Sequence, residues 1–335
     1  MLVSLPPVAA VEGVGLEQRF GETDAPRASV FAPSPLLTVT IEPHPDEAQI
    51  HFHPGGQGYW IARMAAALGV DVTLCTSFGG ESGQVIRGLL DEDSITVRSI
   101  ETTGDNGSYV HDRRSGERVE IAEMPAAPMS RHEIDELYGM TLVEGLEAGI
   151  CVLGGPSAPD VIPADMYERL AEDLTANGAT VVADLSGEPL AAVLAGGVAV
   201  VKVSDEELAA EQRADPDDID SIVAAIHDLA ARGASNVIVS RAERGMVALL
   251  DERLVEAHAP KLEAVDHRGA GDSLTAGVAA GLARGLSIER ALLLGAAAGA
   301  MNVTRHGLAT GTRDEIERLA ERVECRPLDA LGSAR

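Results

Sequence analysis

The sequence contains few aromatic residues and almost no lysine. Phe, Trp and Tyr make up 3% of the 335 residues, whereas apolar residues together reach 45%. A sizeable core must therefore be built from Ala, Val, Leu and Ile. The length is sufficient for one large α/β domain with a small appendage, or for two ordinary domains. The only lysines are Lys202 and Lys261, a scarcity that a GC-rich genome explains.

Cysteine and long apolar runs are scarce as well. Cys75, Cys151 and Cys325 lie far apart, and no CxxC pair or Cys/His cluster occurs. This excludes a disulfide framework and a zinc site of the usual spacing, and it favours a reducing cytoplasm. No apolar run approaches the ~18 residues of a membrane span. The N-terminus also lacks the basic start and apolar run of a signal peptide. We therefore expect a cytoplasmic protein.

Positive charge is in short supply, and the net charge is −27. Nucleic acids and anionic membranes need a basic surface, so neither is expected as a partner. A small-molecule substrate is the natural alternative. If that substrate is anionic, a local positive site must hold it against the field of the whole chain.

The pattern of strands and helices predicts one main domain over residues 28–322. From residue 149 onwards apolar strands alternate with helices, which is typical of a doubly wound, mostly parallel α/β sheet. Residues 1–27 are rich in Gly, Pro and Glu and are expected to form a loosely ordered leader, and residues 323–335 a C-terminal tail.

Two polar hairpin regions, near 40–55 and 107–122, do not fit this sheet. The first alternates, with Ile50 and Phe52 on one face and His51 and His53 on the other. We expect the two regions to form a small β lid over one edge of the sheet. The lid is also a candidate surface for a homodimer.

The segment DHRGAGDSLTAG, residues 266–277, places two glycines directly before an acid and a helix of small residues. Free N–H groups at a helix N-terminus bind anions, and Gly269 and Gly271 let the backbone approach a ligand closely. Asp272 could then accept a proton from a hydroxyl group while the loop stabilises a transferring phosphoryl group. The alternative is an ordinary Asp N-cap that follows a glycine turn.

Five segments together resemble the ribokinase/PfkB family of carbohydrate kinases. GAGDSLTAG and PGGQGYWIARMAAALG resemble its two signatures, and LGGPSAPDVIPADMYERL is similar to its GSLPPG segment. VVADLSGEPL resembles the DTSG segment of the phosphofructokinase-like branch, and VKVSDEEL the KxNxxE segment. The similarity runs from about residue 30 to 320. It implies a ribokinase-like fold with a β lid, and a kinase that uses ATP and Mg²⁺ to phosphorylate a sugar-like alcohol.

The resemblance also implies roles for single residues. Asp272 is implied to be the catalytic base, with Gly269, Ala270 and Gly271 as the anion hole. Glu207 is implied to organise the Mg²⁺-bound phosphates through water, although it could simply be a solvated acid in the run 205–207. The remaining residues implied to bind the nucleotide are Lys202, Ser240, Gly245 and Asn302.

Several family residues are replaced on the side that binds the sugar. Leu36 stands where many members carry an aspartate on the first strand. In the segment around Gly55 and Gly56, Gln57 replaces a lysine and Trp60 replaces the asparagine that binds sugar hydroxyls. The basic pair of the phosphofructokinase-like branch is replaced by Gly107 and His111. We therefore expect a substrate other than plain fructose 6-phosphate, fructose 1-phosphate or ribose, bound by Gly55, Gly56, Gln57, Trp60 and His111.

Two further departures flank the nucleotide side. The sequence DHR stands where the family has DTT or DTV, which puts Arg268 beside the anion hole. Its guanidinium group is expected to bind a phosphate or carboxylate, although it could instead only brace Asp266. Ala242 replaces a common glycine.

Trp60 could also be plain core packing, and the paired histidines His51 and His53 lack a third ligand for a metal.

Two functions of other classes compete with the kinase. A ligand-binding or regulatory protein on a kinase fold would explain the lost sugar-binding residues, but the intact Asp272 argues against it. A nucleotide-dependent dehydrogenase needs a GxGxxG segment after an early strand and an acid ~20 residues later, and GGQG lacks that context.

Overall fold

A computed structural model describes residues 25–45, 47–90, 95–304 and 307–328. Most of the predicted leader therefore lies outside the described residues. The main domain begins one residue earlier than predicted, because its first strand starts at Arg27. None of the described helices has both the length and the apolar character that a membrane span requires.

Ten strands in the described residues form one large sheet, in the order β14-β13-β12-β11-β10-β9-β8-β1-β4-β5. Its strands are β1 (Arg27–Ala32), β4 (Asp71–Gly79), β5 (Thr96–Thr102), β8 (Ile150–Gly154), β9 (Thr180–Asp184), β10 (Val198–Ser204), β11 (Ala234–Ser240), β12 (Met246–Leu250), β13 (Arg253–His258) and β14 (Glu324–Pro327). The sheet is parallel from β11 to β5 and antiparallel from β11 to β14. The predicted doubly wound, mostly parallel sheet is confirmed.

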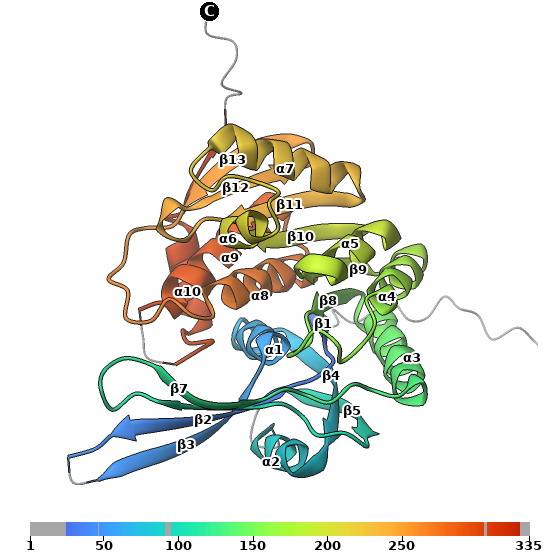
Figure 1. Cartoon of the computed structure of the whole chain (residues 1–335). Helices are drawn as coiled ribbons and strands as arrows, with labels where there is room; N and C mark the ends of the chain where they lie inside the picture. Colours follow the sequence, from blue (N-terminus) through green and yellow to red (C-terminus); the bar gives the residue numbers. More distant parts are fainter. Residues whose placement is uncertain (1–24, 46, 91–94, 305–306, 329–335) are drawn as a thin grey trace, which may run out of the picture.

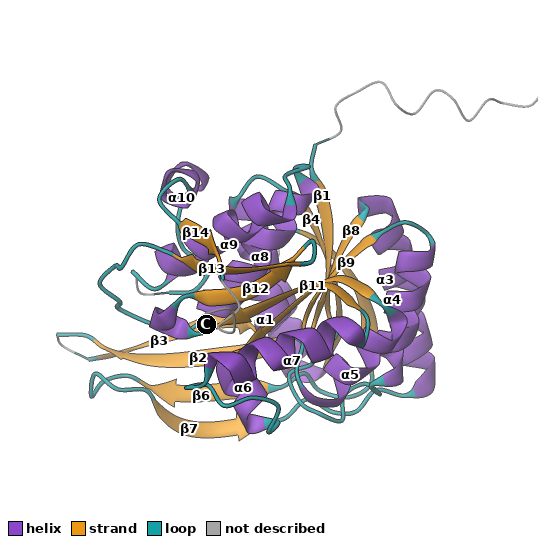
Figure 2. Cartoon of the chain, turned by 90° about the horizontal axis from the view of Figure 1, so that it is seen from above, coloured by secondary structure: helices purple, strands orange, loops and turns teal. Residues whose placement is uncertain are grey.

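Helices cover both faces of this sheet (Figure 2). One face carries α1 (Gln57–Ala67), α2 (Gly80–Leu90), α8 (Ala270–Ala283), α9 (Ile288–Asn302) and α10 (Arg313–Ala320). The other carries α3 (Arg131–Ala148), α4 (Asp165–Ala176), α5 (Gly187–Gly196), α6 (Asp205–Ala210) and α7 (Ile219–Ala231). Central strands such as β8, with the sequence ICVLG, are buried along their whole length, as expected of a parallel sheet covered on both sides.

The small residues of α8 and α9 let these two helices pack closely. A Cβ atom added at Gly277 would lie 2.5 Å from the Cα atom of Gly295. The long small-residue helix after the glycine-acid loop is therefore a packing surface, and it fixes the start of α8 against the body of the domain.

The predicted lid is a separate four-stranded sheet (Figure 1). It contains β3 (Ala48–Gly55), β2 (Leu36–Pro43), β6 (Ser108–Asp112) and β7 (Val119–Met124), in that order. The two outer pairs of strands, β2–β3 and β6–β7, are antiparallel, whereas the central pair, β2 and β6, is parallel. Leu36, placed by comparison on the first strand, instead begins β2, because β1 already ends at Ala32.

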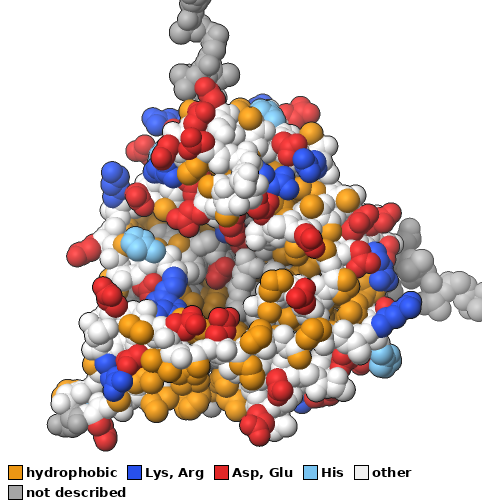
Figure 3. Space-filling view, viewed as in Figure 1, with side chains coloured by type: hydrophobic (Ala, Val, Ile, Leu, Met, Phe, Trp, Pro, Cys, Tyr) orange, Lys and Arg blue, Asp and Glu red, His pale blue; other side chains and the backbone are white. Residues whose placement is uncertain are grey.

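The two faces of the lid differ in polarity. The register aligns His51, Thr40 and His111 in one row across β3, β2 and β6. On the opposite face Ile50 and Phe52 are more than half exposed. The space-filling view shows apolar side chains gathered over the lid at the lower edge of the molecule (Figure 3). The predicted alternation of residues 50–53 is confirmed.

The C-terminal tail was predicted to begin at residue 323, which is too early in the chain. Val323 is buried, and Glu324–Pro327 form β14, which pairs with the outermost β-hairpin strand, β13. The segment ECRP is only half apolar, so it has no strand pattern of its own; it forms a strand because β13 offers an unpaired edge. Residues 329–335 lie outside the described part of the chain.

Candidate active site

The site lies where the order of the sheet reverses. Strand β1 lies between β4 and β8, so the chain runs outwards from this point in both directions, and a crevice forms at the carboxyl ends of the strands. A cavity of about 60 Å³ opens there, lined by Ser34 after β1, by Gly55–Tyr59 and by Gly155–Ser157 after β8. A wider cleft of about 910 Å³ adjoins it and reaches Asp184 and Glu207. Figure 3 shows the hollow between lid and body.

The glycine-acid loop forms the N-terminus of α8. Gly269 is the N-cap with φ +70°, a left-handed conformation that favours glycine, and Ser273 N donates to its carbonyl oxygen at 2.9 Å. The helix starts at Ala270, so Asp272 lies inside its first turn. The alternative of an ordinary Asp272 N-cap is therefore wrong. The N–H groups of residues 270 and 271 have no hydrogen-bond acceptor among the described residues, as is usual in the first turn of a helix, where such groups can bind an anion.

A buried polar cluster lies beside this loop. Lys202 Nζ, at the end of β10, lies 3.3 Å from Asp184 Oδ1, at the end of β9. Thr275 Oγ1 donates to Asp184 Oδ2 at 2.5 Å. A Cβ atom at Gly271 would lie only 2.7 Å from Lys202 Nζ, so the absence of a side chain at Gly271 lets the ammonium group lie close to the loop.

Burial raises the pKa of Asp272 to about 7, and the nearby carboxylate of Asp184 adds to the effect. Lys202 opposes it, and Glu207 adds a smaller rise. Burial alone would lower the pKa of Lys202, but Asp184, Glu207 and Asp272 outweigh it, so that pKa is raised and the amine stays charged. Asp272 can therefore take up and release a proton near neutral pH, as a general base requires.

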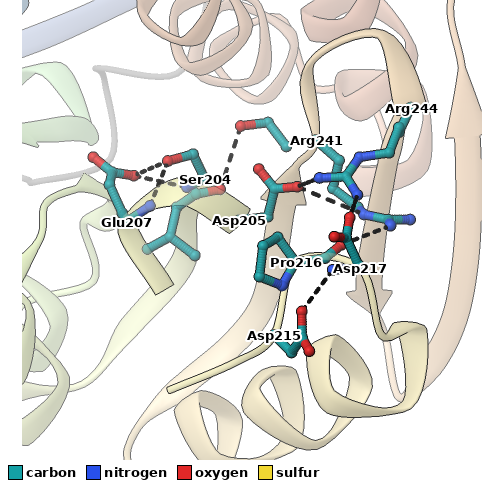
Figure 4. A network of polar contacts seen from close by, with 10 residues as sticks. Ser204, Asp205, Glu207, Asp215, Pro216, Asp217, Arg241 and Arg244 are labelled. Carbon is teal, nitrogen blue, oxygen red and sulfur yellow. Dashed lines mark hydrogen bonds and ion pairs between the residues drawn. The ribbon is translucent and has the colours of Figure 1, made fainter. Parts of the chain in front are cut away.

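Glu207 is held at the start of α6. Its Oε2 accepts hydrogen bonds from Ser204 N (2.7 Å) and Ser204 Oγ (2.8 Å) in a capping box (Figure 4). Its Oε1 has no hydrogen-bond partner among the described residues. Arg244 anchors the neighbouring acid, Asp205, at 2.6 Å. One oxygen of Glu207 thus stays available beside the cleft, while the other caps α6. The alternative, a solvated acid with no role in binding, stays open.

The other residues predicted to bind the nucleotide lie on adjoining elements. Ser240 ends β11, and Gly245, with φ +81°, closes the turn between the 3₁₀-helix η1 (Ala242–Arg244) and β12. Ala242 adopts φ +47°, a left-handed conformation that favours glycine. Asn302, the last residue of α9, is fully buried, and its Nδ2 donates to the carbonyl oxygen of Arg268 at 2.6 Å. Its side chain thus holds the anion-hole loop.

Arg268 braces Asp266. Its Nε and Nη2 atoms lie 3.2 and 3.0 Å from the two carboxylate oxygens, and its backbone N donates to Oδ1 at 3.2 Å. The bracing alternative is therefore present in the structure. Its side chain is 39% exposed, and the buried Nη1 atom has no hydrogen-bond partner within the described part of the chain, so anion binding by this residue stays a prediction.

On the predicted sugar side, Gln57 lies between the two cavities. Its Oε1 accepts a hydrogen bond from Gly155 N at 2.8 Å and so ties the start of α1 to the end of β8. Trp60 is half-buried, packs against the core and lies 4.6 Å from the ring of Tyr59. The core-packing alternative for Trp60 therefore accounts for at least part of its surface, and its substrate role is still a prediction.

His111 is buried in the lid, 3% exposed, with Nε2 3.2 Å from Thr40 Oγ1. Burial lowers its pKa to about 4, and the nearby Arg118 and Arg113 add to the effect. An imidazole with this pKa is neutral at pH 7. His111 therefore cannot replace the missing basic residue as a cation.

Sequence reasoning missed several residues of this site. Asp184 ends a buried strand inside the VVADLSG segment, and a search for acids at strand ends could have found it. Thr275 lies three residues after Asp272, so the helical period also gave a signal. Arg113, which contacts Asp266 from the lid at 3.6 Å, gave no local signal.

No group of three or more His, Cys, Asp or Glu residues in the described ranges could hold a metal ion by itself. Mg²⁺ that arrives with nucleotide phosphates keeps several waters and needs only one or two carboxylates. The free oxygen of Glu207 fits that lesser demand.

Comparison with known proteins gives a consistent result. A profile of the pfkB family carbohydrate kinases matches residues 34–315. The chain is 27% identical over 304 residues to ATP-dependent 6-phosphofructokinase isozyme 2 of Escherichia coli, covering 85% of this chain and 97% of that protein. It is 29% identical over 272 residues to 1-phosphofructokinase of Bacillus subtilis, covering 81% and 88%.

Solved structures agree. Phosphofructokinase-2 of Escherichia coli in complex with potassium superimposes with a TM-score of 0.79 at 25% identity, covering 88% of this chain and 98% of that chain. The same protein has also been solved as a tetrameric inhibited form, with a TM-score of 0.78, the same identity and the same coverage.

Proposed function

The chain belongs to the pfkB family of carbohydrate kinases, and from that membership we propose that it transfers the terminal phosphoryl group of ATP to a hydroxyl group of a sugar or sugar-like molecule. The observation that carries the proposal is Asp272. It lies in the first turn of α8, beside an anion hole, with a pKa raised to about 7. A base with that pKa matches the working pH of a cell.

In the proposed reaction Asp272 takes the proton of the acceptor hydroxyl. The acceptor oxygen forms a bond to phosphorus as the bond between phosphorus and the ADP oxygen breaks. The N–H groups of Ala270 and Gly271 donate hydrogen bonds to the transferring phosphoryl group, and Lys202 adds positive charge beside the loop. No covalent enzyme intermediate is required.

Residues on the other side of the loop bind the nucleotide in this proposal. Ser240, Gly245 and Asn302 would flank it, and the free oxygen of Glu207 would help to hold Mg²⁺ through water. Mg²⁺, when bound with ATP, would neutralise the charge of the phosphates. Arg268 lies next to the anion hole and would supply a further positive charge for a phosphate or an acidic acceptor group.

The acceptor in this proposal differs from those of the named relatives. Leu36 and Gly107 offer no polar side chain, and neutral His111 offers no positive charge. Each sugar hydroxyl left without a hydrogen bond costs ~1–3 kcal/mol. An acceptor with fewer hydroxyls, with a ring that can stack on Trp60, or with an acid group near Arg268 suits the site better. Gly55, Gly56 and Gln57 line the small cavity where its reactive end would lie.

We also propose that the enzyme is a homodimer joined through the lid. Apolar side chains of Ile50, Phe52, Val119 and Ile121 are at least half exposed there, and such a patch on a lid usually marks an interaction surface. Phe52→Asp should shift the protein from dimer to monomer in analytical ultracentrifugation. A wild-type chain that is monomeric at micromolar concentration would refute the dimer.

The test of the proposed reaction is a panel of sugars, sugar phosphates and nucleosides, assayed for ADP release with MgATP. Asp272→Asn serves as the inactive control and Glu206→Gln, at an exposed acid on α6 next to Glu207, as the active one. We expect ADP release with at least one acceptor, and little with fructose 6-phosphate. Efficient turnover of fructose 6-phosphate would show that the substitutions are compensated elsewhere.

The competing function is a non-catalytic protein that binds sugar or nucleotide and regulates a partner, which the loss of the usual sugar-binding residues favours. Thermal-shift assays separate the alternatives. A stabilisation by MgATP without ADP release from any acceptor supports the regulatory protein, whereas stabilisation by NAD alone would support a dehydrogenase.

A further inference from the structure

The backbone of the anion-hole loop is fixed at Arg268, directly before Gly269. Three nitrogen atoms of Arg268 bind the carboxylate of Asp266, and its carbonyl oxygen accepts from Asn302 Nδ2. Gly269 then turns the chain into α8 with φ +70°. A shift of Asp266 would therefore move the N–H groups of Ala270 and Gly271, which follow Arg268 within three residues.

Asp266 is itself held from two sides. Its backbone N donates to Val303 O at 3.2 Å, which ties it to the end of α9. Its Oδ2 also lies 3.6 Å from Nη2 of Arg113. The carboxylate is only 11% exposed, so both guanidinium groups share a partly buried partner, where screening by solvent is weaker than on an open surface.

Arg113 belongs to the lid. It directly follows β6, and its backbone N donates to Ile41 O of β2 at 2.8 Å, which continues the lid ladder. Its side chain is 24% exposed. The contact thus joins the first residue of the β6–β7 turn, which this backbone bond ties to β2, to the carboxylate that fixes the loop.

We propose that Arg113 is a positioning residue that couples the lid to the anion hole through Asp266 and Arg268. When the lid lies over the acceptor, Arg113 holds Asp266 and the loop keeps the geometry that stabilises the transferring phosphoryl group. When the lid opens, this support is lost. The coupling rests on the proposed phosphoryl transfer for its use, but the contact can be tested without any acceptor.

The first measurement is limited trypsin cleavage of the full chain, followed by mass spectrometry. Cleavage after Arg114 and Arg118 reports opening of the lid hairpin, and cleavage after Arg169 in α4 reports global unfolding. Arg113→Gln and Asp266→Asn should each speed hairpin cleavage about tenfold and leave cleavage after Arg169 unchanged. Mg²⁺ with a non-hydrolysable ATP analogue should slow hairpin cleavage about threefold or more in wild type and have no effect in Arg113→Gln.

The second measurement is a double-mutant cycle on turnover with an acceptor from the panel. Arg113→Gln should lower kcat about tenfold in the wild-type background, since a misplacement of about 1 Å can cost ~10²-fold and only part of the support is lost here. In the Asp266→Asn background it should change kcat less than twofold. The Michaelis constants for ATP and acceptor should stay within twofold.

The matched control is Arg114→Gln. Arg114 neighbours Arg113 in the same hairpin but pairs with Asp112 at 2.6 Å and is 55% exposed, so kcat should not change. If Arg113 contacted the acceptor itself, Arg113→Gln would raise the acceptor Michaelis constant, and the effects of the two substitutions would multiply; that result overturns the proposal. The proposal is also overturned if a bound ATP analogue leaves the rate of hairpin cleavage in wild type unchanged. Failure of the analogue to bind wild type at all, seen by thermal shift, refutes the proposed kinase function instead.

Discussion

Asp272→Asn tests the acid–base chemistry of the site through stability as well as activity. In the unfolded chain the carboxyl group has its ordinary pKa of 3.8, and in the folded protein about 7. Between these values the folded protein binds one proton more than the unfolded chain. The contribution of Asp272 to stability is therefore fully present below about pH 4 and is lost as the pH rises to about 7.

The magnitude follows from the size of the shift. About three pKa units correspond to roughly 4 kcal/mol, since each unit is about 1.4 kcal/mol. Above pH 7 the ionised Asp272 thus lowers the free energy of unfolding by up to this amount. A neutral Asn of the same shape does not, so Asp272→Asn should be the more stable protein at pH 8, and its advantage should grow by about 1.6 kcal/mol between pH 5.5 and pH 7.

The assay is urea unfolding of both proteins at several pH values from 5.5 to 8.5, with Glu206→Gln as the control. Glu206 is exposed on α6, and its replacement removes one charge from the same highly acidic chain without touching the loop. In parallel, wild-type kcat should rise with pH and level off above about pH 7, and Asp272→Asn should lose at least ~10²-fold in turnover. A stability difference that stays flat from pH 5.5 to 8.5, or turnover within a few-fold of wild type, would refute the role of Asp272.

Three further substitutions test other parts of the site. Lys202→Met leaves Asp184 buried without its cation and should lower the free energy of unfolding by about 3–5 kcal/mol in urea; the double variant with Asp184→Leu should regain most of it. Ala242→Gly relieves a left-handed conformation and should raise that free energy by about 0.5–1 kcal/mol; an unchanged or lower value contradicts strain at this position. Arg268→Ala should raise the Michaelis constant for ATP or for an acidic acceptor, with a stability change of about 1 kcal/mol or less; a large stability loss with unchanged Michaelis constants would limit Arg268 to bracing Asp266.

The sheet and the lid could be predicted because their signals are local. Alternating apolar strands and helices specify the parallel sheet, and the alternation of Ile50 and Phe52 with the histidines specifies a two-faced lid. Strand β14 could not be predicted in this way, since ECRP becomes a strand only by pairing with β13. Its structure is a property of the edge that it meets.

In the candidate site too, features within one segment could be predicted and contacts between distant segments could not. The residues of the loop Gly269–Asp272 are consecutive, so its anion-binding geometry could be predicted from one short segment of sequence. The contact of Asp184 with Thr275 joins residues 91 positions apart, and that of Arg113 with Asp266 joins the lid to the C-terminal half of the domain. Such contacts depend on the packing of β9, β10 and α8, and no local pattern carries them.

The parallel pairing of β2 with β6 has a consequence for how the protein folds. Thr40 meets His111 across 71 residues of chain, and between them lie α1, β4, α2 and β5, which belong to the main domain. The entropy of closing such a loop is large unless the intervening chain is already compact. The lid should therefore assemble only after β4 and β5 have joined β1. Its amide hydrogens should be the last to gain protection in a refolding experiment followed by hydrogen exchange.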